Sequence, residues 1–468
     1  MSIPCRIEGS DALEAIRAQW SNSYIADGDA LFAEGADPEF CKKQSRVVLI
    51  LSASRSGSSW LAEMCASSTQ FASLPGEIDP FLILALGQPD VSNGESDELG
   101  VWRLTPSVAE AMSLHLSLFV GNGAPEEQER LTPKRLFQTQ MRILLQWPEL
   151  HEHMDEVRWV IRKAFQEARD LPWEIRMIHY LKYLKKILPD LNPYYYDLDP
   201  DLVRDSFPEQ RVPAGPPNPI GVIEEPPFIC ESPWTTARGR ETTQLPLIIK
   251  SPSNAYRLDF LRSLFCNAEI TVIHVMREPA ACVTGLMCGW LHHGFFKHRI
   301  YPRTLEIEGY TRSDQPWTSE WWKFDLPPGW TEYTHRRLEE ACRFQWISAN
   351  EHILRWVQRN RNDIEYVQTT ERMLTYDTRR EMARLFENLR LQADEDSIDA
   401  LKCDRRTMVS YGVCDERRAE LRRIATGITD CMRVRYIIDA YQDAGSSPSR
   451  KRVFIRPRIR THGLRSIA

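Results

Sequence analysis

The sequence predicts an α/β fold in which a central, mainly parallel sheet is flanked by helices. Short apolar runs, typical of buried strands, occur at residues 46–52, 245–250, 268–276 and 364–370. A helical pattern or a helix-start signal follows each of these runs. Because strands that alternate with helices are joined by right-handed crossovers, we expect these strands to lie parallel in one sheet. We treat residues 1–468 as one domain built on that sheet.

The first strand opens the unit around which the chain is organised. The strand at 46–52 leads into a run of small residues, and a helix is expected over 58–65. The segment 74–82 contains glycine and two prolines, which predict a turn after a possible second strand. That turn carries Glu77 and Asp79 near the carboxyl edge of the predicted sheet, and residues 45–82 together form the cofactor loop and the acidic turn.

A long region separates this unit from the next one. Apolar residues recur at helical spacing over 108–119 and 153–190, so we expect residues 100–240 to be a large helical insertion. Its last part, 192–237, is rich in proline and acidic residues and is expected to be a loop. A short helix is also predicted before the first strand, over residues 10–20.

The second half of the chain returns to alternating strands and helices. We expect a helix over 253–265 that is capped by Ser253, and a long helix over 336–359. Residues 294–335 form an irregular segment rich in aromatic residues. The basic tail, 445–468, is expected to be solvated.

Composition and charge argue against several classes of protein. The formal net charge of −6 does not favour a general nucleic-acid-binding surface. No stretch approaches the roughly 18 apolar residues of a membrane span, and the N-terminus lacks the apolar core of a signal peptide. The eleven cysteines include no C-x-x-C pair, so we expect reduced thiols in a cytoplasmic protein rather than disulfides or a zinc site.

The loop after the first strand has the features of an anion-binding site. Small residues let backbone N–H groups turn inward at a helix N-terminus, where the helix dipole favours negative charge. Arg55 adds a fixed positive charge, and the serine hydroxyls add hydrogen-bond donors. The loop is not a Walker A motif, because no lysine follows Gly57. The candidate cofactor-binding residues of this loop are Arg55, Ser56, Gly57, Ser58, Ser59 and Trp60.

Two further strand ends carry cations. The strand at 268–276 delivers Arg277 to a turn before a helix that starts near Pro279, and Thr284 lies two turns into this helix. We expect the side chains of Arg277 and Thr284 to converge on one anion. Lys250 ends the preceding predicted strand and should lie beside the anion-binding loop, although a solvated lysine at a strand end is an equally good interpretation.

Four pieces of the sequence, in the same order, resemble sulfotransferases that use 3′-phosphoadenylyl sulfate. The run RSGSSWL resembles their 5′-phosphosulfate-binding loop, and VIHVMREPAACVTGLM resembles the strand, turn and helix that bind the 3′-phosphate. LPLIIKSPSNAYRLDFLRSLF resembles the K-[ST]-P segment of bacterial members, and Cys266 replaces a proline that usually follows. IEYVQTTERMLTYDTRREMARLFENLRL resembles a later segment, with Glu371 in the matching place. Glu278 replaces the usual Asp or Asn, and Thr284 is offset by one residue from the usual serine.

This resemblance implies a P-loop-like fold, 3′-phosphoadenylyl sulfate as the sulfuryl donor, adenosine 3′,5′-bisphosphate as the product, and no metal. It places Arg55 at the leaving oxygen, Ser58 and Ser59 at the 5′-phosphate, and Arg277 at the 3′-phosphate. Trp60 is expected to stack on adenine. Lys250 is expected to meet the transferring sulfuryl group, where fixed cations stabilise the charge that grows in the transition state. The matched pieces of the chain are about residues 45–82, 245–291 and 364–391.

A base should accept the proton of the acceptor. Glu77 is the first choice, because its turn resembles the base-bearing segment of tyrosylprotein and N-heparan sulfotransferases, and Asp79 lies close behind it. His115 is the alternative, since cytosolic sulfotransferases use a histidine at a similar distance, although a histidine in such an amphipathic run is more often a packed residue. A histidine cluster, His292, His293 and His298, is a further possibility; it has no carboxylate partner at metal-ligand spacing.

The acceptor side is marked by aromatic residues in 309–330. Trp317, Trp321, Trp322 and Trp330 fall in one irregular stretch. Their rings have two equally weighted explanations: they stack on a sugar or aromatic acceptor, or they pin a long loop to the core.

The sequence as a whole therefore favours sulfuryl transfer to a hydroxyl or amine of a small molecule or saccharide. A nucleotide-dependent kinase is the first rival, but it predicts a lysine after Gly57 and an acidic strand end for magnesium. A non-catalytic nucleotide-binding protein on the same fold is the second rival, and detectable sulfate transfer would exclude it. The acceptor and the oligomeric state are left open.

Overall fold

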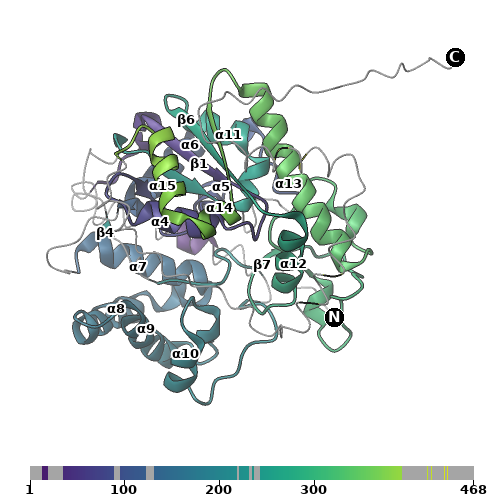
Figure 1. Cartoon of the computed structure of the whole chain (residues 1–468). Coiled ribbons are helices and arrows are strands. Elements are labelled where there is room, and N and C mark those ends of the chain that lie inside the picture. The colour runs from purple at the N-terminus through teal and green to yellow at the C-terminus, as the bar shows by residue number, and fades with distance from the viewer. Residues whose placement is uncertain are drawn as a thin grey trace.

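The structure is a computed structural model that describes residues 13–18, 35–88, 95–122, 131–218, 221–230, 235–236 and 243–392, together with residues 419, 423, 437 and 440. Figure 1 shows a central sheet enclosed by helices, with a further helical lobe beside it. Residues 13–18 are helical, in agreement with the short helix predicted there. The basic tail at 445–468 lies outside the described residues.

The main sheet is mostly parallel, as the alternation of strands and helices predicts. Its strands lie in the spatial order β4-β3-β2-β5-β1-β6-β9. Every neighbouring pair from β2 to β9 is parallel, and β3 pairs antiparallel with both β2 and β4. The bounds are β1 Arg46–Leu51, β2 Ala72–Ser73, β3 Gly121–Asn122, β4 Thr235–Thr236, β5 Leu247–Lys250, β6 Glu269–Met276 and β9 Glu365–Thr370.

The helices occupy the connections between the strands and the inserted lobe. Their bounds are α3 Phe40–Lys43, α4 Ser58–Ala66, α5 Asp79–Leu86, α6 Pro106–Phe119, α7 Pro133–Gln146, α8 Met154–Ala168, α9 Trp173–Ile187, α10 Pro200–Ser206, α11 Leu258–Leu264, α12 Pro279–Trp290, α13 Leu338–Asn360, α14 Glu371–Tyr376 and α15 Thr378–Asn388.

The apolar residues of β1 divide between two layers of helices because successive side chains of a strand point to opposite faces. Val48 and Ile50 pack in a cluster with residues of α4, α14 and α15. Val47, Leu49 and Leu51 belong to a larger cluster that includes α5, α6, α11, α12 and α13. Figure 1 shows α4, α14 and α15 together on one side of the sheet. The sheet is therefore buried on both faces, and its strand ends are the places where polar groups collect.

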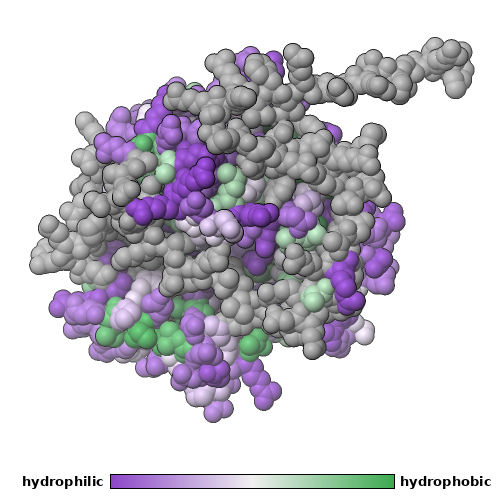
Figure 2. All heavy atoms as spheres, viewed as in Figure 1, coloured by the Kyte–Doolittle hydropathy of each residue, from purple (hydrophilic) through white to green (hydrophobic). Residues whose placement is uncertain are grey.

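Helices α6 to α10 lie within residues 100–240, where a large helical insertion is predicted. The same region also contributes β3 and β4 to the main sheet, and α10 lies within 192–237, where a loop is predicted. Helices α8 and α9 pack against each other and extend away from the sheet in the lower part of Figure 1. Figure 2 shows hydrophobic residues gathered over this lower lobe, where Leu171 is exposed between α8 and α9. Among the described residues no helix is long and apolar enough to cross a membrane.

Two further local predictions need correction. The helix predicted over 253–265 is a 3₁₀ turn at Pro252–Tyr256 followed by α11, and its N-cap is Arg257. Ser253 does not cap a helix, because its hydroxyl donates instead to Asp97 Oδ2 at 2.7 Å. The aromatic segment 294–335 is also less irregular than predicted, since β7 Phe296–Arg299 and β8 Trp321–Lys323 form an antiparallel pair within it.

Candidate active site

Five charged side chains follow the carboxyl ends of neighbouring strands. Glu77 comes after β2, Lys250 ends β5, Arg55 follows β1, Arg277 follows β6 and Glu371 follows β9. Because these strands are adjacent and parallel, their carboxyl ends meet at one edge of the sheet. That edge is where open α/β sheets bind ligands. Neighbouring ends for Arg55 and Lys250, predicted from the sequence, are confirmed by the pairing of β1 with β5.

The loop between β1 and α4 has the strained backbone expected of a tight anion cradle. Gly57 has φ 94° and is the N-cap of α4, and Arg55 has φ 67°. Glycine adopts a positive φ without steric cost, but an arginine reaches the left-handed region at a cost, so the conformation at Arg55 is one that the surroundings impose. A Cβ on Gly57 would lie 3.3 Å from Cγ of Glu371, so glycine also permits the close approach of α14. Ser58, Ser59 and Trp60 form the first turn of α4.

Hydrogen bonds of buried hydroxyl and thiol groups hold this loop in place. Ser52 donates to Ser58 Oγ at 2.9 Å, and Ser54 donates to Asp325 Oδ1 at 2.7 Å. The Cys282 thiol of α12 donates to the Ser54 carbonyl oxygen at 3.3 Å and lies 3.4 Å from Ser56 Oγ. The structure therefore positions the loop through α12 and the segment after β8, both distant in the sequence.

Arg277 joins the second strand–turn–helix unit, residues 245–291, to the first. Its Nη1 donates to the backbone carbonyl oxygen of Arg55 at 2.9 Å, and its Nε lies 4.0 Å from Glu371 Oε2. A Cβ on Gly285 would lie 3.3 Å from Arg55 Cβ and 3.5 Å from Arg277 Nη1. The absence of a side chain at Gly285 therefore lets both arginines pack closely against α12. The two units thus face a common site.

The structure does not bring the Thr284 hydroxyl to Arg277 as predicted. Thr284 is buried, and its Oγ1 donates to the Ala280 carbonyl oxygen at 2.6 Å within α12. A threonine in a helix readily makes this bond to the preceding turn. Glu278, which stands where the resemblance has Asp or Asn, is the N-cap of α12, because its carboxylate accepts from Ala280 N and Ala281 N.

On the other side of the loop, Glu77 lies between two lysines. Lys250 Nζ donates to Glu77 Oε1, and Lys297 Nζ lies 3.8 Å from Glu77 Oε2. Lys297 also lies 3.1 Å from Asp79 Oδ1 and donates to Ser253 Oγ at 2.9 Å. Glu77 is therefore the outermost carboxylate of a chain of ion pairs that continues into the core.

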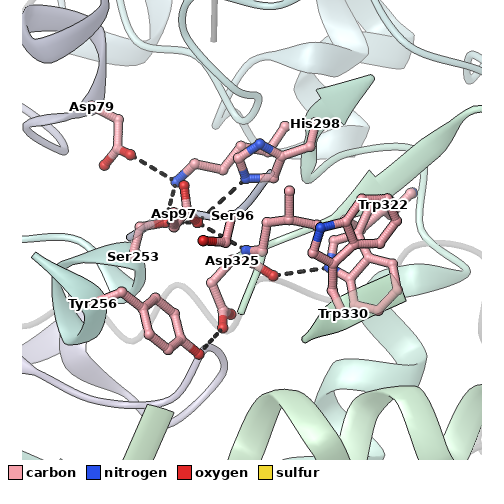
Figure 3. Close-up of polar contacts among 12 residues, drawn as sticks. Asp79, Ser96, Asp97, Ser253, Tyr256, His298, Trp322, Asp325 and Trp330 are labelled. Carbon is pink, nitrogen blue, oxygen red and sulfur yellow. Dashed lines mark hydrogen bonds and ion pairs between the residues drawn. The ribbon is translucent and has the colours of Figure 1, made fainter. Parts of the chain in front are cut away.

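Asp79 and Asp97 form the inner part of this chain. Arg257 is fully buried and binds Asp79 Oδ1 at 2.7 Å and Asp97 Oδ1 at 2.6 Å. Asp97 also accepts from Leu326 N at 2.8 Å. Figure 3 shows Asp79, Asp97 and Ser253 directed toward one another, and Asp325 held by Tyr256. Burial by itself would raise the pKa of both carboxyl groups. At Asp97 the attraction of His298 and Arg257 is larger than this effect, and the pKa is lowered. At Asp79 the attraction of Arg257 and Lys297 has the same result, and its pKa is lowered too.

Two adjacent carboxyl groups, Glu224 and Glu225, lie in the segment 221–230 near this ion-pair chain. Glu224 pairs with Arg142 of α7 at 2.5 Å, and burial raises the pKa of Glu224 to about 7. Burial raises the pKa of Glu225 to about 8, against the attraction of Lys297, with Glu77 and Asp79 adding repulsion. Glu225 therefore belongs to the electrostatic surroundings of Glu77, and the helical insertion reaches the same region through Arg142.

The histidines fall into different environments. His115 lies on α6, and burial, with a contribution from Arg17, lowers the pKa of its imidazole to about 3. His292 and His293 stack with their ring centroids 4.0 Å apart, and burial lowers their pKa values to about 2 and about 4. His298 is buried, with Nε2 3.4 Å from Asp97 Oδ2. His298 thus contacts the ion-pair chain directly, at Asp97.

The sequence left two roles open for the tryptophans: stacking on an acceptor, or packing a long loop against the core. The structure separates Trp317 from the other three. Trp321 and Trp322 are fully buried, and Trp322 donates to the Asp325 carbonyl oxygen at 2.9 Å. Trp330 is also buried and packs edge-on against Trp322. These rings pin the loop to the core and present no free face to an acceptor. Trp317 is only partly buried and contacts Phe296 edge-on.

Several residues of the site carry no sequence signal of their own. Lys297, Asp97 and Glu225 lie outside the segments that resemble sulfotransferases, and they meet one another and Arg257 only in the fold. One signal was available: Arg257 lies in the K-[ST]-P segment that resembles sulfotransferases. Within the described residues, no group of three or more His, Cys, Asp or Glu side chains is placed to hold a metal.

Comparisons with known proteins point to one family. A family model described as the sulfotransferase family matches residues 48–329. None of the curated proteins searched matches this chain. Among solved structures, a sulfotransferase domain from the curacin biosynthetic pathway is 11% identical with a TM-score of 0.32, over 85% of this chain and 98% of that one. Sulfotransferase STF1 from Mycobacterium tuberculosis H37Rv is 10% identical with a TM-score of 0.30, over 86% and 80% of the two chains. Similarities this weak carry no argument about residues or substrates.

Proposed function

Because the chain belongs to the sulfotransferase family and is therefore a transferase, we propose that it moves a sulfuryl group from 3′-phosphoadenylyl sulfate to a hydroxyl or amine of a small-molecule or saccharide acceptor. The observation that carries this proposal is the order of charged groups along the sheet edge. The base candidate Glu77 lies at one end, Arg277 lies toward the other, and Lys250 and Arg55 lie between them.

The donor would occupy the middle and the Arg277 side of this edge. The first turn of α4, with Ser58 and Ser59, supplies N–H groups and hydroxyls for the 5′-phosphate. Arg277, which already touches the loop through Arg55, is in place to bind the 3′-phosphate. Its Nε makes no hydrogen bond to a described residue, which leaves a donor for an anion. Trp60, partly buried on α4, is the candidate to stack on adenine.

The sulfuryl group would lie between the loop and Glu77. During transfer the acceptor oxygen bonds to sulfur, the bond from sulfur to the 5′-phosphate oxygen breaks, and negative charge leaves with the bisphosphate. Arg55 and Lys250 are the cations that flank this position and would stabilise that charge. The guanidinium of Arg55 packs over the Phe295 ring at 5.1 Å, which restricts its orientation.

Glu77 would accept the proton of the acceptor. It is half-buried at the sheet edge and contacts Lys250, the residue proposed to hold the sulfuryl group. Asp79 is a poorer candidate because Arg257 and Lys297 already bind its buried carboxylate. Trp317, the least buried of the proposed acceptor-contacting tryptophans, is the one that we retain for that role. The described cysteines are free thiols, which supports the cytoplasm as the compartment.

The test is a transfer assay with labelled 3′-phosphoadenylyl sulfate against hydroxylated small molecules, amines and sugars. We expect label to pass to at least one acceptor, and adenosine 3′,5′-bisphosphate to raise the melting temperature. Donor and bisphosphate that both leave the melting temperature unchanged, together with no transfer in the screen, would refute the proposal.

A further inference from the structure

The proposed function asks Lys250 to serve the sulfuryl group, yet in the structure Lys250 Nζ donates to Glu77 Oε1. Sulfuryl oxygens placed beside Lys250 would compete with Glu77 for the same ammonium group. If Lys250 were the only cation at Glu77, donor binding would leave a half-buried carboxylate without a partner. An unpaired carboxylate in such a place is costly and tends to take up a proton, which would disable it as a base.

A second cation prevents this. Lys297 Nζ lies 3.8 Å from Glu77 Oε2, on the carboxylate oxygen that Lys250 does not contact. That oxygen is buried and makes no hydrogen bond to a described residue. The two lysines therefore divide the carboxylate between them, so that Lys250 can leave Oε1 while Lys297 stays at Oε2.

Lys297 is well fixed for such a role. Asp79 and the Ser253 hydroxyl both bind its ammonium, and β7, which carries it, pairs with β8. Burial opposes its charge, but Asp79 and the other nearby carboxylates outweigh burial and raise the pKa of Lys297. Lys297 therefore stays cationic at neutral pH. Unlike Lys250, it is held by partners in the core and stays in place when the donor binds.

We propose that Lys297 is the positioning residue of the base: when the donor draws Lys250 away, Lys297 keeps the Glu77 carboxylate ionised and oriented, with Oε1 open to the acceptor. This inference rests on the proposed function. In the step itself, the proton of the acceptor hydroxyl moves to Glu77 Oε1, the hydroxyl oxygen bonds to sulfur, and the bisphosphate leaves with the electron pair of the broken S–O bond.

Other charged groups also face Glu77, and they do not replace Lys297. Asp79 on α5 and Glu225 on the 221–230 loop are carboxyl groups, so their charge favours protonation of Glu77 rather than opposing it. Arg257 lies behind Asp79 and Asp97, and it is paired with both. Two cations lie against Glu77 among the described residues, Lys250 and Lys297, and Lys297 is also held by Asp79 and Ser253.

The first test is the pH profile of kcat for Lys297→Gln and Lys297→Arg with donor saturating. Loss of a cation about 4 Å away disfavours the ionised base, so the acidic limb of the Gln variant should move to higher pH by roughly one unit or more. The Arg variant should restore the wild-type profile. Arg299→Gln, two residues along the same strand and paired with Glu320, is the matched control and should leave the profile unchanged.

The double variant Lys297→Gln/Asp79→Asn keeps the buried charges balanced and serves if the single variant does not fold. Because loss of the Asp79 charge itself favours the ionised base, this variant is compared with Asp79→Asn alone, and its acidic limb should lie at higher pH than that of Asp79→Asn. A wild-type profile in folded Lys297→Gln, or a double variant whose profile matches that of Asp79→Asn, would overturn the role of Lys297 and leave the proposed function standing. A wild-type enzyme that transfers no sulfate would count against the proposed function itself.

The second test does not need activity. Melting temperatures of Lys250→Met, Lys297→Gln and their combination form a double-mutant cycle through Glu77. The drop in melting temperature caused by Lys297→Gln should be larger in the Lys250→Met background, where Lys297 is the last cation at Glu77. Drops of equal size in both backgrounds would show that Lys297 does not act on Glu77.

Discussion

Arg277 donates a hydrogen bond from Nη1 to the backbone carbonyl oxygen of Arg55, at 2.9 Å. This contact joins residues that lie 222 positions apart and that follow the neighbouring strands β1 and β6. It brings the loop after β1 and the turn after β6 together at one place on the sheet edge. A nucleotide with phosphates at both its 5′ and 3′ positions is the kind of ligand that such a site fits.

Adenosine 3′,5′-bisphosphate should therefore raise the melting temperature more than AMP, which lacks the 3′-phosphate. Arg277→Ala should weaken bisphosphate binding and leave AMP binding nearly unchanged, as measured by calorimetry. Arg390→Ala is the matched control, because Arg390 pairs with Glu269 and Glu365 at the opposite end of β6 and β9. Equal stabilisation by both nucleotides would argue against a 3′-phosphate site.

Arg55 and Lys250 should act mainly on the transition state, because both flank the place where charge develops. We expect Arg55→Met and Lys250→Met to lower kcat by on the order of 10²-fold while KM for the donor changes much less. Steady-state kinetics measure both constants. A change confined to KM would restrict the two residues to binding. Addition of a chelator should leave the rate intact, since no divalent metal takes part in the proposed step.

Glu77→Gln should keep bisphosphate affinity and lose on the order of 10²- to 10⁴-fold in turnover, because the amide cannot accept the proton. Asp79→Asn and His115→Ala should be milder in turnover, since Asp79 is engaged by Arg257 and His115 is buried on α6. Single-turnover assays with each variant show which of the three residues acts as the base. Near wild-type turnover in Glu77→Gln and a dead His115→Ala would instead assign the base to His115. If all three variants stay active, His292 and His293 are the next candidates.

Arg257→Ala should destabilise the fold strongly, because it leaves Asp79 and Asp97 buried without their main cation. Breaking a buried ion pair in this way costs roughly 3–5 kcal/mol, which urea unfolding would detect. Arg262→Ala, on the half-exposed side of α11, is the control and should cost much less. The lowered pKa values of Asp79 and Asp97 imply stability that is present above the ordinary carboxyl pKa and lost as the pH falls below about 4.

Glu225→Gln should stabilise the protein at alkaline pH. Burial raises the pKa of Glu225 to about 8, so its contribution to stability is present at acidic pH and is lost as the pH rises through that value. The stability gap between the variant and the wild type should therefore widen from pH 5 to about pH 8.5 in urea unfolding. Glu98→Gln, at an exposed position, is the control. A gap that stays constant over this range would show that Glu225 remains ionised in the fold.

The sequence by itself determined the framework of the site. Apolar runs, small-residue loops and helix-start signals are local patterns, and their order along the chain set the parallel sheet and its carboxyl edge. Arg55, Lys250, Arg277 and Glu77 could be predicted because each follows a strand directly, and β-sheet geometry brings such positions together.

Only the tertiary structure decided which side chains meet behind that edge. Arg257 and Lys297 contact acids that are more than 150 residues away in the sequence, and no local pattern encodes such a contact. The Thr284 hydroxyl bonds to its own helix, because a carbonyl oxygen one turn back is always within its reach. Trp321 and Trp322 face the core because β8 pairs with β7 there, and that pairing, rather than their aromatic character, made them structural residues.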